Sequence, residues 1–264
     1  MRKKVGLALG SGGARGLAHI GVLEVLEGEG IPIDMIAGTS SGALIGAVYA
    51  IGESINELKG IAREIGSRRF SLLVDPALPR TGLVRGRKME DMMKAAMGAV
   101  AFDDLKIPLA CVATDIGNGE EVVIKQGLVW QGVRASFSIP VLMSAVKWEG
   151  RYLVDAALVN PVPVSVLKEM GADFIIAVNV IPHRITGQSR EPNIITIFMQ
   201  MMNISSNRLV ESCISGANIV IEPEVSHIAP GHYHRVDECI EQGRLAAQEA
   251  IPSIKKAIAG MRRK

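Results

Sequence analysis

One stretch of the sequence decides the fold: Ile33-Asp34-Met35-Ile36-Ala37-Gly38-Thr39-Ser40-Ser41-Gly42-Ala43-Leu44-Ile45-Gly46-Ala47-Val48. Its pattern predicts a short apolar strand, a turn at Gly38-Thr39-Ser40-Ser41-Gly42, and an Ala- and Gly-rich helix. A serine on such a turn is held in a strained conformation with its hydroxyl exposed. Small residues two positions to either side let strand and helix approach closely. The stretch therefore has the form of a nucleophile elbow, with Ser40 as the candidate nucleophile, supported by Gly38 and Gly42.

The composition indicates an aliphatic, close-packed protein. Hydrophobic residues make up 48% of the 264 residues, charged residues 21% and aromatic residues 4%. This length suits a single α/β domain with a sizeable core. The formal net charge of +2 argues against a dedicated nucleic-acid-binding protein, which usually has a concentrated basic face.

The cysteines and the apolar runs predict a cytoplasmic protein. Cys111, Cys213 and Cys239 are odd in number and widely spaced, as expected of reduced, buried thiols. The basic N-terminus resembles the start of a signal peptide, but the apolar run after it breaks at Gly10-Ser11-Gly12-Gly13. No uninterrupted apolar stretch is long enough to span a membrane, so we expect any membrane contact to be peripheral and transient.

The N-terminal part of the chain predicts a βαβ unit. Val5 to Leu9 is an apolar run typical of a strand buried on both faces. A glycine-rich loop, Gly10-Ser11-Gly12-Gly13-Ala14-Arg15-Gly16, follows it, and then a helix from Leu17 to Leu26. The elbow strand comes next, so we expect the first two strands to be parallel neighbours.

The segment from residue 51 to about residue 100 has interrupted helical signals and the main basic cluster of the chain. The basic residues are Arg68, Arg69, Arg80, Arg85, Arg87 and Lys88. One interpretation is a solvated, partly mobile connection. The other is a lid or a docking surface for anionic lipid headgroups, because basic residues gain free energy near such surfaces.

The rest of the chain continues the α/β pattern without an internal repeat or a domain boundary, so we expect one domain over residues 1–264. The predicted strands are Leu109–Asp115, Glu121–Ile124, a hairpin through Trp148–Asp155, Phe174–Val180 and Ile219–Ile221. The predicted helices are Trp130–Ser136, Pro163–Met170, Ile194–Ser215 and Asp237–Ile258, with a polar loop at 181–193. The Met-rich helix offers an apolar surface for a second subunit.

Two functions compete for the glycine-rich loop. Gly10-x-Gly12-x-x-x-Gly16 is one residue longer than a dinucleotide fingerprint, and Asp34 lies near the distance expected of a ribose-binding acid. However, Asp34 precedes its strand instead of following it. The alternative is an oxyanion hole formed by the amides of Gly12 and Gly13. Since parallel neighbouring strands bring this loop and Ser40 to one edge of the sheet, the oxyanion hole is favoured.

Ser40 needs a base, and spacing alone does not select one. The histidines are His19, His183, His227, His232 and His234. His19 falls one turn into the first helix and is interpreted as a packing residue, whereas the last three follow in the chain order of an α/β-hydrolase triad. The acids at strand ends are Asp115 and Asp155, and either could instead cap a turn.

Four sequence blocks together resemble those of the patatin-like phospholipases, in particular the compact bacterial members. They are Gly10–Gly16, Gly38–Gly42, Ala135-Ser136-Phe137-Ser138-Ile139-Pro140 and Val154-Asp155-Ala156-Ala157-Leu158-Val159-Asn160-Pro161-Val162-Pro163. The likeness extends from Val5 to about Val180. It implies a three-layer α/β/α sandwich with a mostly parallel central sheet. It also implies a Ser–Asp dyad of Ser40 and Asp155 without histidine, an oxyanion hole at Gly12 and Gly13, and Arg15 adding positive potential nearby.

The resemblance implies an esterase that hydrolyses phospholipids or lysophospholipids through an acyl-enzyme, with no cofactor. No metal-binding motif is present in the sequence, so we expect metal-independent catalysis. The methionines Met89, Met92, Met93, Met97, Met199, Met201 and Met202 fill either the core or an acyl pocket. One departure from the family favours an alternative, a non-catalytic acyl-lipid-binding or regulatory protein. The family usually has Asp-Gly-Gly or Asp-Gly-Ala where this chain has Asp155-Ala156-Ala157, and alanine at a positive φ would cost about 1 kcal/mol.

Overall fold

A computed structural model describes residues 3–67, 86–182 and 193–261. Its centre is an eight-stranded sheet in which the strands pair in the order β5-β6-β3-β2-β1-β7-β8, with β4 also paired to β3. The strands are β1 (Val5–Leu9), β2 (Met35–Thr39), β3 (Leu109–Asp115), β4 (Glu121–Ile124), β5 (Val146–Trp148), β6 (Arg151–Asp155), β7 (Phe174–Val178) and β8 (Ile219–Ile221). Since β1, β2, β3, β7 and β8 run parallel, the sheet is mostly parallel, as predicted.

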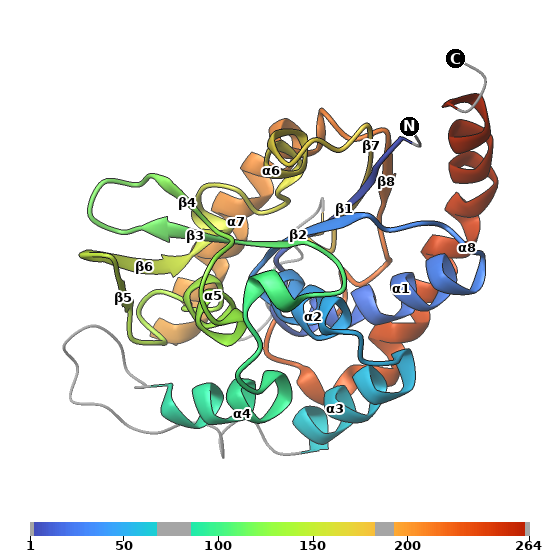
Figure 1. Cartoon of the computed structure of the whole chain (residues 1–264). Helices are drawn as coiled ribbons and strands as arrows, with labels where there is room; N and C mark the ends of the chain where they lie inside the picture. The colour runs from blue at the N-terminus through green and yellow to red at the C-terminus, as the bar shows by residue number, and fades with distance from the viewer. Residues whose placement is uncertain (1–2, 68–85, 183–192, 262–264) are drawn as a thin grey trace.

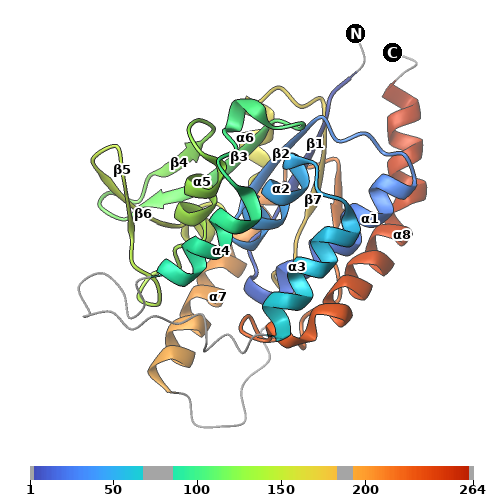
Figure 2. The same ribbon diagram turned by 60° about the horizontal axis from the view of Figure 1, so that its bottom comes forward.

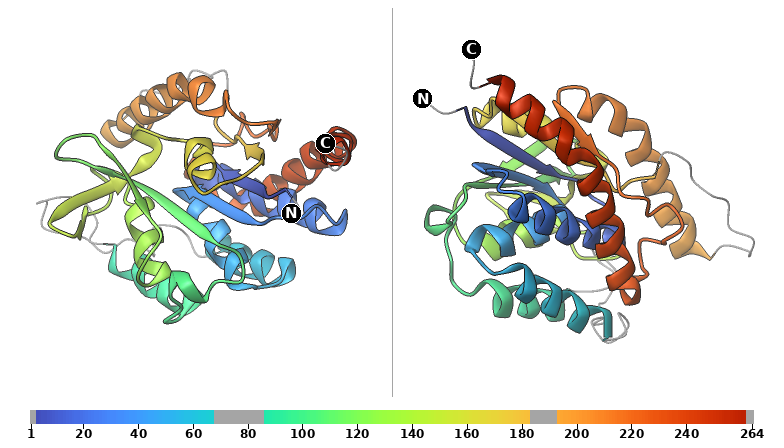
Figure 3. Two further views of the ribbon diagram at one scale, coloured as in Figure 1. Left: turned by 45° about the horizontal axis from the view of Figure 1, so that its top comes forward. Right: turned by 90° about the vertical axis from the view of Figure 1, so that its right-hand side faces the viewer.

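Helices cover both faces of the sheet. They are α1 (Ala18–Gly28), α2 (Ser41–Ile51), α3 (Ile55–Ser67), α4 (Arg87–Met97), α5 (Val129–Ser136), α6 (Val164–Glu169), α7 (Ile194–Ile214) and α8 (Val236–Met261). The core on one face is built with α1, α2, α5 and α8, and the core on the other with α6 and α7 (Figure 1). The left view of Figure 3 shows the sheet between α7, in orange, and α3 and α4. The predicted three-layer α/β/α sandwich is therefore confirmed.

The two outer helices pack on other helices: α3 contacts α1, α2, α8 and the short turn Tyr233–Arg235, and α4 contacts α2 and α5. Figure 2 shows them in front of α2. They confirm the interrupted helical signals between residues 51 and 100. Of the basic cluster, Arg87 and Lys88 begin α4, whereas Arg68, Arg69, Arg80 and Arg85 lie outside the described residues. Within the described residues, no helix has the length and apolar character needed to cross a bilayer.

The pairing of β3 sets the position of the site. Residues 109–112 of β3 pair with β2, residues 111–114 with β4, and residues 113–115 with β6. Strand β4 pairs with β3 over residues 111–114, which overlap both the residues paired with β2 and those paired with β6. Because a strand can pair along only two sides, β2 and β6 must both lie on the side of β3 that β4 does not occupy. There they lie end to end. Thr39 pairs with Val112 and Asp155 with the next residue, Ala113, so the carboxyl end of β2 meets that of β6.

Candidate active site

The turn between β2 and α2 has the predicted elbow geometry. Ser40 has a positive φ of 56° with ψ of −119° and is only 3% exposed. A Cβ added at Gly42 would lie 2.0 Å from the Leu9 carbonyl oxygen, and one at Gly38 would lie 2.5 Å from Cα of Ala43. The two glycines therefore allow α2 to leave close to β1 and β2, which holds Ser40 at a backbone conformation that residues with a Cβ rarely adopt.

Asp155 lies beside the elbow. The Ser40 hydroxyl lies within hydrogen-bonding reach of the carboxyl group, and Oδ1 of that group accepts a 2.9 Å hydrogen bond from the Ala157 amide. Burial raises the pKa of Asp155 to about 6, although the Ser40 hydroxyl and the Ala157 amide both oppose the shift by stabilising the ionised form. A carboxyl group with this pKa is largely ionised at neutral pH, yet is a stronger base than an exposed aspartate.

The C-terminal end of α5 holds both residues. The backbone amide of Ser40 donates a 2.8 Å hydrogen bond to Oγ of Ser136, and the backbone amide of Asp155 donates a 2.9 Å hydrogen bond to the carbonyl oxygen of Ser138. Ser136 and Ser138 are fully buried. Two residues of one short segment thus fix the backbone of the elbow and that of the strand end relative to each other. The sequence predicts the helix that carries Ser136 but assigns this serine no role.

Asp115, the other acid considered for this role, serves a turn. Its Oδ1 accepts a 2.9 Å hydrogen bond from the Gly117 amide, and its Oδ2 lies 3.8 Å from Nη1 of Arg151. These are the contacts of a residue that caps the turn between β3 and β4. The geometry therefore distinguishes Asp155 from Asp115, which the spacing leaves open.

The glycine-rich loop presents two free amides. The Ser11 amide donates to the Pro161 carbonyl and the Ala14 amide to the Pro230 carbonyl, both at 2.8 Å. Between them, the amides of Gly12 and Gly13 have no hydrogen-bond acceptor among the described residues. Leu9 pairs with Gly38, so this loop begins beside the elbow. Free donors at this place are the feature that an oxyanion hole requires.

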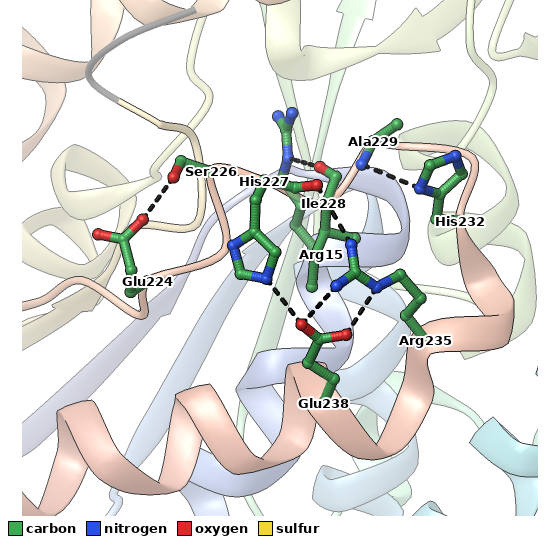
Figure 4. Close-up of polar contacts among 9 residues, drawn as sticks. All are labelled: Arg15, Glu224, Ser226, His227, Ile228, Ala229, His232, Arg235 and Glu238. Atoms are coloured by element: carbon green, nitrogen blue, oxygen red, sulfur yellow. Dashed lines mark hydrogen bonds and ion pairs between the residues drawn. The ribbon is translucent and has the colours of Figure 1, made fainter. Parts of the chain in front are cut away.

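Arg15 connects the loop to the C-terminal part of the chain. Its Nε donates a 2.6 Å hydrogen bond to the Ile228 carbonyl, as Figure 4 shows. The side chain is 6% exposed, its Nη1 has no partner within the described residues, and burial lowers its pKa to about 10. Arg15 therefore remains protonated at neutral pH, with its charge between the glycine-rich loop and the segment at 227–232.

The described histidines make no hydrogen bond to Ser40 or Asp155. His19 is fully buried, its Nε2 contacts the Gly10 carbonyl oxygen at 2.8 Å, and burial lowers its pKa to about 4. His227 contacts Glu238 at 2.7 Å, as Figure 4 shows. His232 and His234 have ring centroids 5.3 Å apart. His183 lies outside the described residues. The arrangement provides a serine and a carboxyl group, but no triad built from these four histidines.

The departure at Ala156 and Ala157 causes no backbone strain. Both residues lie in a short 3₁₀ helix that Asp155 caps, and neither has a positive φ. The expected cost of alanine at these positions is therefore absent. The observation that favoured a non-catalytic protein has no support in the geometry.

Asp34 does not lie where a ribose-binding acid is needed. It precedes β2 and accepts a 2.7 Å hydrogen bond from the Val5 amide at the start of β1. The glycine-rich loop follows the opposite, C-terminal end of β1. Asp34 therefore cannot serve as the ribose-binding acid of a dinucleotide site at the glycine-rich loop. In the part of the chain that the structure describes, no three His, Cys, Asp or Glu side chains gather as metal ligands.

Comparison with known proteins gives concordant matches. Residues 7–168 match the family model of patatin-like phospholipases. An uncharacterised NTE family protein of Mycobacterium tuberculosis is 36% identical over 210 residues, which cover 79% of this chain and 58% of that protein. Lysophospholipase NTE1 of Scheffersomyces stipitis is 29% identical, over 97% of this chain and 19% of the relative. The chain thus spans less than two thirds of the length of each of these relatives.

A solved structure gives the same fold. The crystal structure of VipD from Legionella pneumophila superposes with a TM-score of 0.59 over 96% of this chain and 67% of that protein, at 15% sequence identity.

Proposed function

The chain belongs to the patatin-like phospholipase family, and from this premise we propose that it is a metal-independent serine hydrolase of lipid carboxylic esters, such as phospholipids or lysophospholipids. The observation that carries the proposal is the contact between the Ser40 hydroxyl, on a strained elbow, and the buried carboxyl group of Asp155. A serine hydroxyl is a weak nucleophile until a base within hydrogen-bonding reach accepts its proton. The three cysteines are free thiols, which supports a reducing compartment such as the cytoplasm.

In the proposed reaction, Ser40 Oγ attacks the ester carbonyl carbon while its proton moves to Asp155. The amides of Gly12 and Gly13 stabilise the oxyanion of the tetrahedral intermediate. The bond to the alcohol then breaks, and Asp155 returns the proton to the leaving oxygen. Water next attacks the acyl-Ser40 ester with Asp155 again as the base, which releases the fatty acid and restores the serine.

The direct test is hydrolysis of a short-chain p-nitrophenyl ester by the purified protein in the presence of a chelator. We expect turnover that the chelator leaves unchanged and that continues after one equivalent of product is released. A folded protein that releases no product would refute the proposed hydrolase, and activity that the chelator abolishes would refute its metal independence.

The pH dependence follows from the raised pKa of Asp155. Only the ionised carboxylate accepts the serine proton, so kcat/KM is expected to rise with pH and to level off above an inflection near 6. A pH–rate profile with the same ester measures this. An inflection near 7 or above would instead indicate a histidine base.

Ser136 is proposed as a positioning residue for Ser40. In Ser136→Ala, the buried Ser40 amide loses its acceptor, which costs about 1–3 kcal/mol. Because this hydrogen bond fixes the backbone of the elbow, we expect its loss to misplace Ser40 and to lower kcat about 10- to 100-fold, with little change in KM. Ser136→Thr, which keeps the hydroxyl, should recover much of the loss. Ser212→Ala, which removes a hydroxyl at the far end of α7, is the control. Unchanged kcat in Ser136→Ala would contradict this role.

A further inference from the structure

A cavity lies between α2 and the two outer helices, and four residues at one end of it belong to the surroundings of the dyad. They are Gly13, Ser41, Phe137 and Tyr233. Gly13 carries one of the free amides, and Ser41 follows the candidate nucleophile. Phe137 lies between Ser136 and Ser138. Burial and the nearby Asp155 carboxylate both raise the pKa of the Tyr233 phenol, so Tyr233 lies close to Asp155. These four residues place this end of the cavity next to the dyad, although Ser40 and Asp155 do not themselves line it.

Away from the dyad, the cavity wall is aliphatic. Helix α2 contributes Leu44 and Val48, α3 contributes Leu58 and Ile61, and α4 contributes Met89 and Met93. None of these six side chains carries a polar group beyond a thioether sulfur. A slot of this kind binds hydrocarbon and excludes charged or strongly hydrated groups, which would lose their water without gaining a partner.

We propose that this cavity binds the acyl chain of the substrate, with the ester carbonyl at Ser40 and the methyl end between α2, α3 and α4. The inference rests on the proposed hydrolase function and names the part of the substrate that the enzyme selects. It also divides the methionines. Met89, Met92 and Met93 line the cavity, Met97 is buried in the core outside it, and Met199, Met201 and Met202 belong to α7 on the other face of the sheet.

The length of the cavity favours an acyl chain of medium length. Ser41 and Val48 both line it, and α2 rises about 10 Å between them at about 1.5 Å per residue. An extended hydrocarbon advances roughly 1.25 Å per carbon, given C–C bonds of about 1.5 Å, so the cavity matches a chain of about eight carbons. Longer chains would need the helices to separate or would leave carbons outside.

The test is a series of p-nitrophenyl esters, from acetate through butyrate and octanoate to palmitate, with kcat/KM for each. We expect a maximum near octanoate. Ala62→Phe places a ring in the cavity and should lower the octanoate-to-acetate ratio of kcat/KM about tenfold or more. Ala259→Phe, the same change at an exposed position of α8, should leave that ratio unchanged. Equal ratios in the two folded variants would overturn the proposal.

A second pair of variants covers the case in which Ala62→Phe does not fold. Met93→Ala enlarges the cavity and should shift the maximum toward longer chains, whereas Met97→Ala removes an equally buried methionine one turn away, outside the cavity, and should not. A shift common to both variants, or absent from both, would contradict the acyl site.

Binding separates this inference from the proposed reaction. Calorimetric titration of the wild-type protein with octanoate is expected to show binding that weakens in Ala62→Phe or Met93→Ala, even if no ester is hydrolysed. If esters are hydrolysed but Ala62→Phe and Met93→Ala leave the chain-length preference unchanged, the acyl site is refuted and the hydrolase stands. If octanoate binds but no ester is hydrolysed, the hydrolase is refuted and the acyl site stands. If octanoate does not bind and no ester is hydrolysed, both proposals fail.

Discussion

Replacing Asp155 with Asn is expected to lower kcat/KM for ester hydrolysis about 1,000-fold or more, because the amide cannot accept the Ser40 proton. The fold should persist, since Oδ1 of the amide can still accept the hydrogen bond from Ala157 that the carboxyl group now accepts. Asp115→Asn is the matched control, because that carboxyl group caps a turn and does not contact Ser40. Equal losses in the two variants would contradict the assignment of the base to Asp155.

The same variant is expected to be more stable than the wild type at alkaline pH. The folded protein holds the pKa of Asp155 near 6, above the ordinary value of 3.8. Ionisation in the folded state is therefore unfavourable, and the wild type loses stability as the pH rises from about 4 through about 6. Two pKa units correspond to about 3 kcal/mol at most. Urea unfolding at about pH 8 and about pH 4 should show a gain for Asp155→Asn that disappears at the lower pH. A variant less stable than the wild type at both values would show that the buried carboxylate is not a cost to the fold.

Replacing Gly42 with Ala is expected to destabilise the protein by about 3 kcal/mol or more. The added Cβ would lie 2.0 Å from the Leu9 carbonyl oxygen and 2.8 Å from that of Gly10. Both atoms belong to backbone at the end of a buried strand, which cannot rotate away as a side chain can. Moving α2 outward would relieve the overlap but would also displace Ser40, so hydrolysis should fall in whatever fraction remains folded.

Gly60→Ala is the control for this variant. Gly60 lies inside α3, and a Cβ there would meet no atom within 4 Å. Alanine in a helix interior is more favourable than glycine by about 0.5–1 kcal/mol, so this variant should be slightly stabilised. Chemical unfolding of both variants gives the comparison, and a Gly42→Ala protein as stable as Gly60→Ala would contradict the close packing at the elbow.

The sequence predicts the elements of this fold well because their signals are local. The runs Val5–Leu9 and Leu109–Ala113 are apolar without interruption, as expected of strands buried on both faces, and the structure has the predicted strands Val5–Leu9 and Leu109–Asp115 with these bounds. Glycines around Ser40 mark the elbow in the same local way. Where the structure differs, the reason is also local: the loop enters α1 through a 3₁₀ turn at Gly13–Leu17, so that helix begins at Ala18.

The partners of Ser40 could not be predicted from local patterns. Asp115 and Asp155 both end strands, and they are distinguished only because β2 and β6 share one edge of β3 in a particular register. The contact between Ser40 and Ser136 joins residues 96 positions apart. The resemblance to a family names Asp155, but the physical reason for its position lies in strand pairing, which a single sequence does not reveal.

Which methionines line the cavity also could not be predicted from the sequence. Their helical spacing is compatible with a core, the interpretation that the sequence favours, and also with a pocket. Only the packing of α3 and α4 on α2 separates Met89, Met92 and Met93, which line the cavity, from the methionines of α7.

The most direct measurement of the central claim is mass spectrometry of the protein after reaction with a fluorophosphonate, which forms a covalent bond with an activated serine. We expect one adduct, on the peptide that carries Ser40, and no adduct in the Ser40→Ala protein. An adduct on a different serine, or a folded wild-type protein that hydrolyses esters without being modified at Ser40, would contradict the assignment of Ser40 as the nucleophile.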